Sequence, residues 1–305
     1  MITNNMIKIN NMIKINNMIK INNMIKSNSM TKSEDAVSEV IGMVLVLSIS
    51  MLVIGSIVLV GLPMIENGKN RAKMDIVANS FLFLQNDIEE VVRGPIWVKN
   101  PFNTTNTDRL GPSRETELEL MEGTLSVISN ESNITFLNTT NTITVIPGNI
   151  IYNTDTEEIA YENGAVIRKY ESGEPLMISD PLISIYDTGG NTTVSIHAIT
   201  LNGTKSSVGG EGKAWAEIRL KNYTQIVEPT GPPNSNQTNI KIYTKYPDTW
   251  KNYFDMKLKD AGLVNPTGYN ISGTFPLNIE IYGNVNNRPD IFLSIYESRL
   301  DVKVR

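Results

Sequence analysis

Few residues of this chain stand in patterns that could do chemistry. Asp187-Thr188-Gly189 follows the apolar run Leu182–Tyr186. In two copies, such a turn can hold two carboxylates that share one proton and act as acid and base. The sequence contains no second copy of the triplet, so we interpret it as a β-turn built from Asp, Gly and Asn.

The other titratable candidates do not form a constellation. The single histidine, His197, lies between Ile196 and Ala198, and no serine elbow or second histidine accompanies it. The chain has no cysteine, which removes thiolate nucleophiles and thiolate metal ligands. The cluster Val208–Gly212 lacks the Gly-Lys-Ser/Thr ending of a phosphate loop and is interpreted as a flexible turn.

Acidic residues are grouped at two places. Glu115, Glu117 and Glu119 alternate along one expected strand and are interpreted as a solvated face. A calcium site that combines such acids with Asp155, Glu157 and Glu158 is the alternative, but no EF-hand spacing is present. We therefore expect no catalytic residue, no metal, no cofactor and no enzymatic activity.

The part of the chain after residue 94 has the pattern of an antiparallel β-rich domain. Leu118 and Leu120 alternate with glutamates, and Asn163-Gly164 between two apolar runs predicts a hairpin with a type I′ turn. Further strands are expected at 181–187, 193–201, 213–220, 239–244, 277–283 and 290–304. Residues 94–113 and 229–239 are expected to be loops, and a short helix is expected after Pro247, ending at Gly262.

A helical segment precedes this domain. Its apolar residues recur at spacings of three and four: Met74, Val77, Phe81, Leu84, Ile88 and Val91. Gly94-Pro95 stops the helix, and Pro63 is a candidate kink at its start. The apolar stripe is expected to pack on the β-rich domain.

Residues 40–65 contain no charged side chain. As a helix they span about 39 Å, whereas a bilayer core needs only about 20 residues. Five lysines precede the segment, which predicts a cytoplasmic N-terminus and an outer C-terminal part. No Ala-x-Ala site follows the segment, so a cleaved secretory signal fits poorly and a plain signal anchor is the simplest alternative.

The residues before this segment carry a more specific pattern. Glu34, Asp35, Ala36 and Val37 lead into Ser38, Glu39, Val40, Ile41 and Gly42. A charged pair, a small residue and then Val-Ile-Gly resemble the class III leader of archaeal type IV pilins and archaellins. The resemblance implies that a prepilin peptidase cuts after Ala36 or, as the second choice, after Asp35. It also implies that the apolar helix is retained, with a lipid bilayer and other pilin subunits as partners.

The resemblance divides the chain into four parts. These are a cytoplasmic leader (1–36), a transmembrane or pilin-type helix (37–65), an amphipathic continuation of this stem (66–93) and a β-rich extracellular head (94–305). The leader contains a hexapeptide repeat over residues 4–27, interpreted as a low-complexity extension, and Met30 is an alternative start. Glu39, Val40, Ile41 and Gly42 are the residues expected to take part in helix assembly. Glu39 either complements the helix dipole or pairs with the N-terminal amine of another subunit.

Composition agrees with an exported surface protein. The net charge of −5 disfavours binding to nucleic acid. Nine Asn-x-Ser/Thr sequons follow the apolar segment, at Asn103, Asn130, Asn133, Asn138, Asn191, Asn202, Asn222, Asn236 and Asn270. Two hypotheses remain open: a minor pilin or pseudopilin for adhesion or filament assembly, and a single-pass anchored surface-binding protein that does not polymerise.

Overall fold

The computed structural model describes residues 2–93, 112–129, 132–137, 142–189, 191–203, 206–227, 237–282 and 291–305. Contacts divide the chain into two units, Met1–Asn70 and Arg71–Arg305. The described residues form a long helix, two β-sheets and a short helix, which is an α+β fold.

Helix α1 (Ile2–Arg93) contains both the apolar segment and the amphipathic stripe. It is continuous through Pro63 and ends at Arg93, directly before the expected stop at Gly94-Pro95. The hexapeptide repeat is also helical, and its Met and Ile side chains from Met6 to Ile25 are exposed. The six-residue period does not match the 3.6 residues per turn of a helix, so these side chains gather on no single face.

The described strands form two sheets. Sheet A has the order β7 (Leu176–Ser179), β6 (Ala165–Lys169), β5 (Glu158–Glu162), β4 (Asn149–Asn153), β1 (Ser113–Ile128), β10 (Ser206–Val227), β14 (Ile291–Val304), β9 (Thr192–Asn202) and β8 (Ile183–Asp187). Sheet B has the order β12 (Tyr269–Ser272), β13 (Leu277–Tyr282), β11 (Gln237–Tyr243), β2 (Asn133–Leu137) and β3 (Thr142–Val145).

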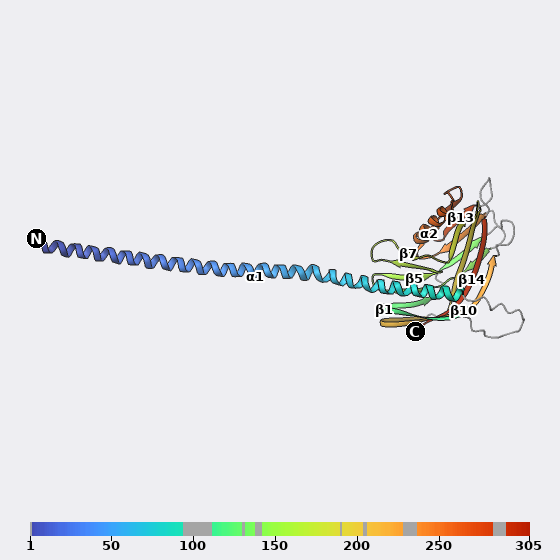
Figure 1. The fold of residues 1–305 in the computed structure, drawn as a ribbon, viewed down its shortest axis with the longest axis horizontal. Coiled ribbons are helices and arrows are strands. Elements are labelled where there is room, and N and C mark those ends of the chain that lie inside the picture. Colours follow the sequence, from blue (N-terminus) through green and yellow to red (C-terminus); the bar gives the residue numbers. More distant parts are fainter. Residues whose placement is uncertain are drawn as a thin grey trace. The chain divides into compact units, whose positions relative to one another are not determined.

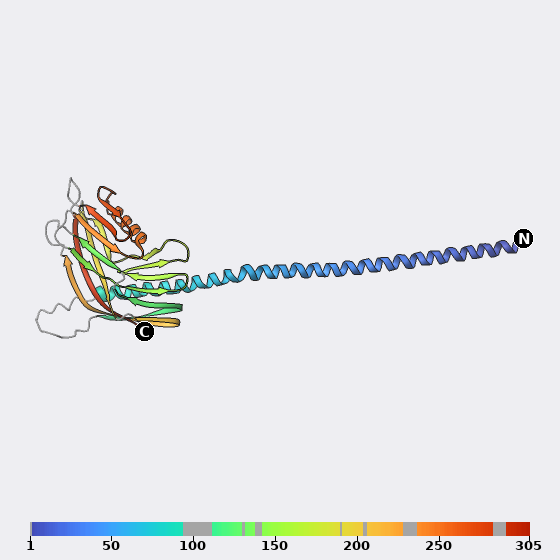
Figure 2. The ribbon, with the colours of Figure 1, turned by 180° about the vertical axis from the view of Figure 1, so that it is seen from behind.

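Sheet A curls around the last part of α1, from residue 71 onward. Its two edge strands, β7 and β8, are consecutive in sequence and joined only by residues 180–182, so the two edges must approach each other. Val77, Phe81 and Leu84 of α1 are buried in one core with side chains from β1, β4, β5, β6, β9, β10 and β14. Figures 1 and 2 show this part of α1 running alongside β1 and β5. Ala214 and Ala216 of β10 line the same core, where small side chains leave room for the helix.

A second core lies on the opposite face of sheet A. There sheet B and helix α2 (Pro247–Asp260) pack against residues of β4, β5, β6, β8, β9 and β14. Trp250, Phe254 and Leu258 of α2 are fully buried in it. The expected short helix is therefore confirmed, and it ends at Asp260, two residues before Gly262.

Most expected strands are confirmed, and so is the hairpin at Asn163-Gly164. Both turn residues have positive φ, 47° and 89°, as a type I′ turn requires. Residues 94–111 and 229–236 of the two expected loops lie outside the described residues. The expected ends of both loops are wrong, because Ser113 begins β1 and Gln237 and Thr238 belong to β11.

Two expectations about the sheets are wrong. The domain is not wholly antiparallel, because β14 pairs with β9 in parallel. The glycine cluster Val208–Gly212 is not a turn but lies inside β10, opposite an irregularity in β1 between Met121 and Gly123. Gly210 and Gly212 adopt φ of 119° and 121°, which only glycine accommodates readily and which lets the strand bend without ending.

Candidate functional site

The proposed processing junction lies within helix α1. Glu34, Asp35, Ala36 and Val37 fall inside its bounds, and their side chains are outside the described ones. The four expected assembly residues that follow, Glu39, Val40, Ile41 and Gly42, are all exposed. No atom other than those of its own helix backbone lies within 4 Å of a Cβ placed on Gly42, so this position leaves space for a close neighbour.

The apolar segment of α1 has the properties of a membrane span. The stretch Glu39–Arg93 is long and apolar enough to cross a bilayer, and the large apolar side chains from Val40 to Ile65 are exposed. Ser48, Ser50 and Ser56 donate to the carbonyl oxygens four residues earlier, at 2.8, 2.7 and 2.7 Å. These hydroxyls are therefore satisfied within the helix, which lowers the cost of placing them in hydrocarbon.

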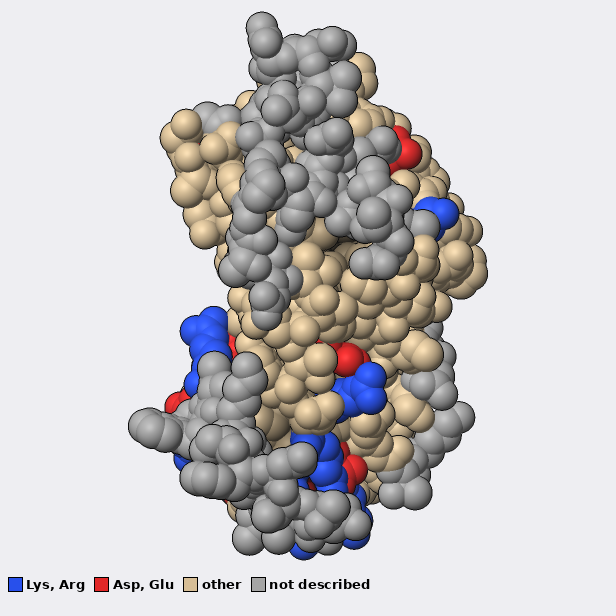
Figure 3. All heavy atoms as spheres, turned by 90° about the vertical axis from the view of Figure 1, so that its right-hand side faces the viewer, with Lys and Arg blue, Asp and Glu red and all other residues tan. Residues whose placement is uncertain are grey.

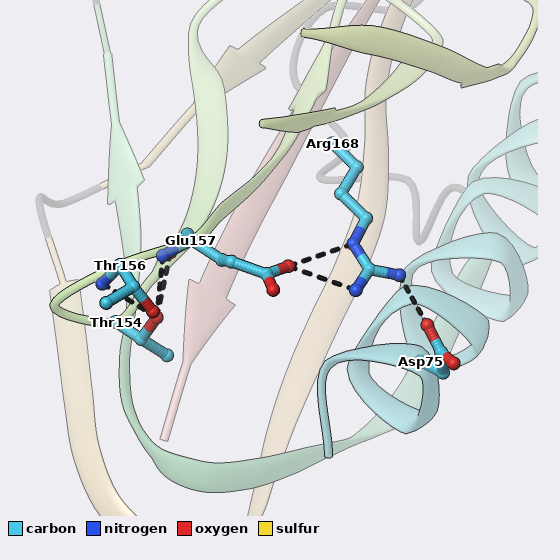
Figure 4. Close-up of polar contacts among 5 residues, drawn as sticks. All are labelled: Asp75, Thr154, Thr156, Glu157 and Arg168. Atoms are coloured by element: carbon cyan, nitrogen blue, oxygen red, sulfur yellow. Dashed lines mark hydrogen bonds and ion pairs between the residues drawn. The ribbon is translucent and has the colours of Figure 1, made fainter. Parts of the chain in front are cut away.

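Where α1 meets sheet A, a buried arginine joins them (Figure 4). Arg168 of β6 donates from Nη1 to Asp75 Oδ1 at 2.5 Å, and from Nε and Nη2 to Glu157 Oε2 at 3.1 and 3.0 Å. The Arg168 side chain is 7% exposed and that of Glu157 11%, whereas Asp75 on α1 is 66% exposed. Burial alone would lower the pKa of the Arg168 guanidinium, but its hydrogen bonds to Asp75 and Glu157 offset this and raise the pKa overall.

The turn between β4 and β5 holds Glu157 in place for this contact. Thr154 Oγ1 accepts from the amide nitrogens of Thr156 and Glu157, at 3.4 and 3.0 Å. Figure 4 shows the threonine on one side of Glu157 and the guanidinium on the other. Glu157, which the sequence offered as an alternative calcium ligand, is thus an ion-pair partner of Arg168, the arginine that contacts helix α1.

Further polar contacts fix α1 in sheet A along its length. Lys73 Nζ lies 2.6 Å from Glu122 Oε2, and Thr116 Oγ1 donates to Asp87 Oδ2 at 2.6 Å. Gln85, which is buried, donates from Nε2 to the carbonyl oxygens of Gly164 and Asp180, at 2.6 and 2.8 Å. Gln85 therefore connects the hairpin turn with the segment that joins the two edges of the sheet.

The hairpin turn at Asn163-Gly164 also helps to hold the two edges of sheet A together. Asn163 Oδ1 accepts from the amide nitrogen of Ile199 on β9 at 3.0 Å. The amide nitrogen of His197 donates to the carbonyl oxygen of Leu182 at 2.9 Å. The Asn-Gly turn thus reverses the chain and also ties β5 and β6 to the far side of the sheet.

A buried carboxylate joins sheet A to the elements that pack on its second face. Glu162 of β5 is 1% exposed. Its Oε1 accepts from Thr244 Oγ1 at 2.6 Å and from Trp250 Nε1 at 2.7 Å, while Oε2 lies 3.3 Å from Asn149 Nδ2. These donors come from β4, from the residue after β11, and from α2, so Glu162 connects sheet A, sheet B and α2.

The residues considered for catalysis have structural partners. Asp187 ends β8, and Thr188 donates from its amide to the Asn191 carbonyl oxygen at 2.7 Å, which confirms the turn. His197 Nε2 lies 2.8 Å from Ser298 Oγ, beside the rings of Tyr223 and Tyr296. Burial and, to a lesser degree, the charge of Arg93 lower the pKa of His197 to about 4.

The grouped acids are also engaged by the protein. Glu115 pairs with Arg305, and Glu117 and Glu119 pair with Lys213 on the outward side of β1 and β10. Glu158 accepts from Tyr246 Oη at 2.5 Å. Among the described residues, no group of three His, Cys, Asp or Glu side chains is placed to hold a metal ion.

Five of the nine sequon asparagines lie among the described residues. Asn202 and Asn222 are exposed, whereas Asn133, Asn191 and Asn270 are half-buried. Asn133 Oδ1 accepts from Thr135 Oγ1 at 3.1 Å, and Asn270 Nδ2 lies 3.4 Å from Glu280 Oε2. The sequons at Asn103, Asn130, Asn138 and Asn236 lie outside the described residues.

Sequence reasoning missed the outward side of α1 in the second unit. Ile76 is 43% exposed and Phe83 is 66% exposed. They are seven residues apart and so lie on one helix face, away from the buried stripe. The signal was present in the sequence, because Phe83 falls two positions after Phe81 and cannot share its face.

Comparison with known proteins identifies a family but no function. No curated protein matches the chain. No solved structure matches it. Residues 100–269, more than half of the chain, match a family described as "Family of unknown function (DUF7289)". The chain therefore belongs to this family of unknown function.

Proposed function

We propose that this protein is a pilin-like surface subunit, a minor pilin or pseudopilin, which serves adhesion or filament assembly. The N-terminus is cytoplasmic, the apolar part of α1 crosses the membrane, and the β-rich head is extracellular. The observation that carries this proposal is that a single helix bears an exposed apolar segment and also supplies the core of the head.

The packing of α1 in the core of sheet A supports a role in which the helix transmits force to the head. An anchor that merely tethers a domain needs only a linker, yet here residues 74–92 are the centre of the larger sheet's core. Arg168, Gln85 and Lys73 contacts add to the apolar packing. A force on residues 74–92 would therefore act on the core of the head.

The outward side of α1 supports contact with further copies of the helix. Ile76 and Phe83 form an exposed apolar pair, with Asn79 and Asn86 exposed on the same side. Repeats of seven residues are the spacing by which helices pack along one another. A second copy of α1 placed against this side would bury Phe83.

The leader resemblance supplies the processing step. A prepilin peptidase would cut before Val37 and leave Glu39 near the new N-terminus, with Val40, Ile41 and Gly42 opening the retained helix. For the sequons, we propose modification at Asn202 and Asn222, because these two asparagines are exposed. The half-buried Asn133, Asn191 and Asn270 are expected to stay unmodified.

Cross-linking between copies tests assembly against the alternative of a non-polymerising anchored protein. The chain has no cysteine, so a single Phe83→Cys variant can be cross-linked in native membranes without background. Met256→Cys, on the exposed side of α2, is the matched control. Dimers or ladders with Phe83→Cys and monomers with Met256→Cys are expected; monomers with both would favour the anchored, non-polymerising protein.

A further inference from the structure

Sheet B has one face in the core and one turned away from it. Ile240 and Ile242 of β11 are buried with Ile279 of β13. Because side chains alternate along a strand, their neighbours point to the opposite face. These neighbours are half-buried amides, hydroxyls and one amine: Asn133, Thr135, Lys241, Tyr243 and Asn278.

Strand register places these side chains in two rows across the sheet. Tyr243 pairs with Asn133, and Lys241 pairs with both Thr135 and Asn278. At a spacing of about 4.8 Å between strands, a row across five strands is about 19 Å long. This length suits an extended ligand of several repeating units better than a small metabolite.

An exposed aromatic residue closes one end of this face. Phe275, between β12 and β13, is 73% exposed. Its ring stands edge-on to that of Tyr243, with 5.3 Å between the ring centres and an angle of 88° between the planes. Tyr243 thereby supports Phe275 in a defined position at the border of the polar rows.

Hydrogen bonds within the face orient several of its polar groups. Thr135 Oγ1 lies 3.2 Å from Thr144 Oγ1 and donates to Asn133 Oδ1 at 3.1 Å. Asn278 Nδ2 lies 3.4 Å from the Pro276 carbonyl oxygen. Groups held in this way lose less conformational entropy when a ligand binds.

The face is almost uncharged, unlike the outer side of sheet A. Lys241 and Glu280 are the charged residues within the described strands of sheet B. The outward side of β1 and β10 instead carries Glu115, Glu117 and Lys213 with further charges. Figure 3 shows charged side chains gathered in the lower part of the described surface that it draws.

We propose that this face of sheet B, with Phe275 at its border, binds a neutral polysaccharide. Sugar hydroxyls both donate and accept hydrogen bonds, as do the amides and hydroxyls of the two rows. The C–H face of a sugar ring can pack on an exposed aromatic ring, and a neutral chain matches the described strands of sheet B, which carry one lysine and one glutamate. A protein partner fits less well, because interface cores bury several apolar residues. The proposal deepens the adhesive role proposed above and rests on the head lying outside the membrane.

Binding to insoluble polysaccharides tests this. The full chain in detergent micelles is mixed with chitin, cellulose or a β-1,3-glucan, and the unbound fraction gives the affinity. We expect retention on at least one of them, and a loss of about tenfold in affinity for Phe275→Ala, as expected when one ring contact is removed. Tyr186→Ala, an exposed aromatic residue on β8, is the matched control and is expected to change affinity less than about twofold.

Three results would overturn the proposal. They are retention on none of the three polysaccharides, an equal loss for Phe275→Ala and Tyr186→Ala, and a glycan attached to Asn133, which would cover the face. The mature N-terminus of the same preparation separates this failure from that of the proposed function. If the N-terminus is cleaved but the protein does not bind polysaccharide, the binding proposal fails and the pilin-like role stands. If the protein binds polysaccharide but its N-terminus is intact, the pilin-like role fails and the binding proposal stands.

Discussion

Arg168 of sheet A forms an ion pair with helix α1 and a second ion pair within its own sheet. It is buried and bridges Asp75 on the helix and Glu157 on the β4–β5 turn. Asp75 is mostly exposed and Glu157 is mostly buried. Loss of the ion pair to Asp75 should therefore lower the free energy of unfolding less than loss of the ion pair to Glu157. A buried pair left with one partner is strongly destabilised, whereas an exposed pair contributes little.

Arg168→Met is expected to lower the free energy of unfolding by roughly 3 kcal/mol, because it leaves Glu157 buried and unpaired. Asp75→Asn removes only the exposed partner and is expected to cost less than about 1 kcal/mol. Urea unfolding of the full chain in detergent, followed by tryptophan fluorescence, measures both. Equal losses for the two variants would contradict the assignment of the buried bridge to Glu157.

His197 is expected to make stability depend on pH. Its pKa is about 4 in the folded protein, against an ordinary value of 6.5. Between these values the unfolded chain binds a proton that the folded protein does not, so stability falls as pH falls from about 6.5 to about 4. Above this window the neutral histidine carries no such penalty.

The variant His197→Gln isolates this effect, because glutamine does not titrate and can still bond to Ser298. The difference in unfolding free energy between the wild-type protein and the variant is measured from pH 7.5 to pH 4. It is expected to shift against the wild type as the pH falls. A difference that stays constant with pH would show that His197 titrates normally in the folded state.

At the scale of elements, helix α1 presents two sides with opposite roles. Phe81 is fully buried in the sheet A core, and Phe83 is mostly exposed two residues later. Phe81→Ala should cost about 3–5 kcal/mol through lost burial and a cavity. Phe83→Ala should change stability by less than about 0.5 kcal/mol and should act on contacts between copies instead.

The unfolding free energy of each variant measures the first effect. The second is measured by the amount of multimer that an amine cross-linker traps for each variant, compared with the wild-type protein. The account predicts an unstable Phe81→Ala, and a stable Phe83→Ala with fewer cross-linked multimers. A Phe83→Ala that unfolds as readily as Phe81→Ala would mean that the outward side of α1 is part of the head's own core.

Elements whose signals are local were predictable, and those that need distant partners were not. The Asn163-Gly164 hairpin, helix α2 and the buried stripe of α1 each follow from neighbouring residues. The parallel pairing of β14 with β9 joins segments about a hundred residues apart, with no local signal. The glycines of β10 looked like a turn, because their positive φ serves a bend within a strand as well as a turn.

The same limit applied to the candidate site. The apolar segment at residues 40–65 can be recognised in sequence, since it depends on residue type and order, and the expected processing junction before it stays a prediction. The partners of Arg168 and Gln85 could not be, because Asp75 and Asp180 lie more than ninety residues away from them. Their contacts exist only once sheet A has closed around the helix.

At the scale of the whole molecule, one helix contributes residues to both units of the chain. The apolar segment is long and apolar enough to cross a bilayer, and residues 74–92 of the same helix lie in the core of the second unit. Sheet B and α2 form a second core on the far side of sheet A, which leaves the outward face of sheet B free of the helix. The proposed role in assembly therefore falls on α1, and the proposed binding role falls on sheet B.

The most direct test is the mature N-terminus of the native protein, measured by mass spectrometry of membranes or surface filaments. The account predicts an N-terminus at Val37 or Ala36, which would show cleavage by a prepilin peptidase and retention of the apolar helix. An intact N-terminus upstream of the apolar segment would contradict it and leave a plain signal anchor.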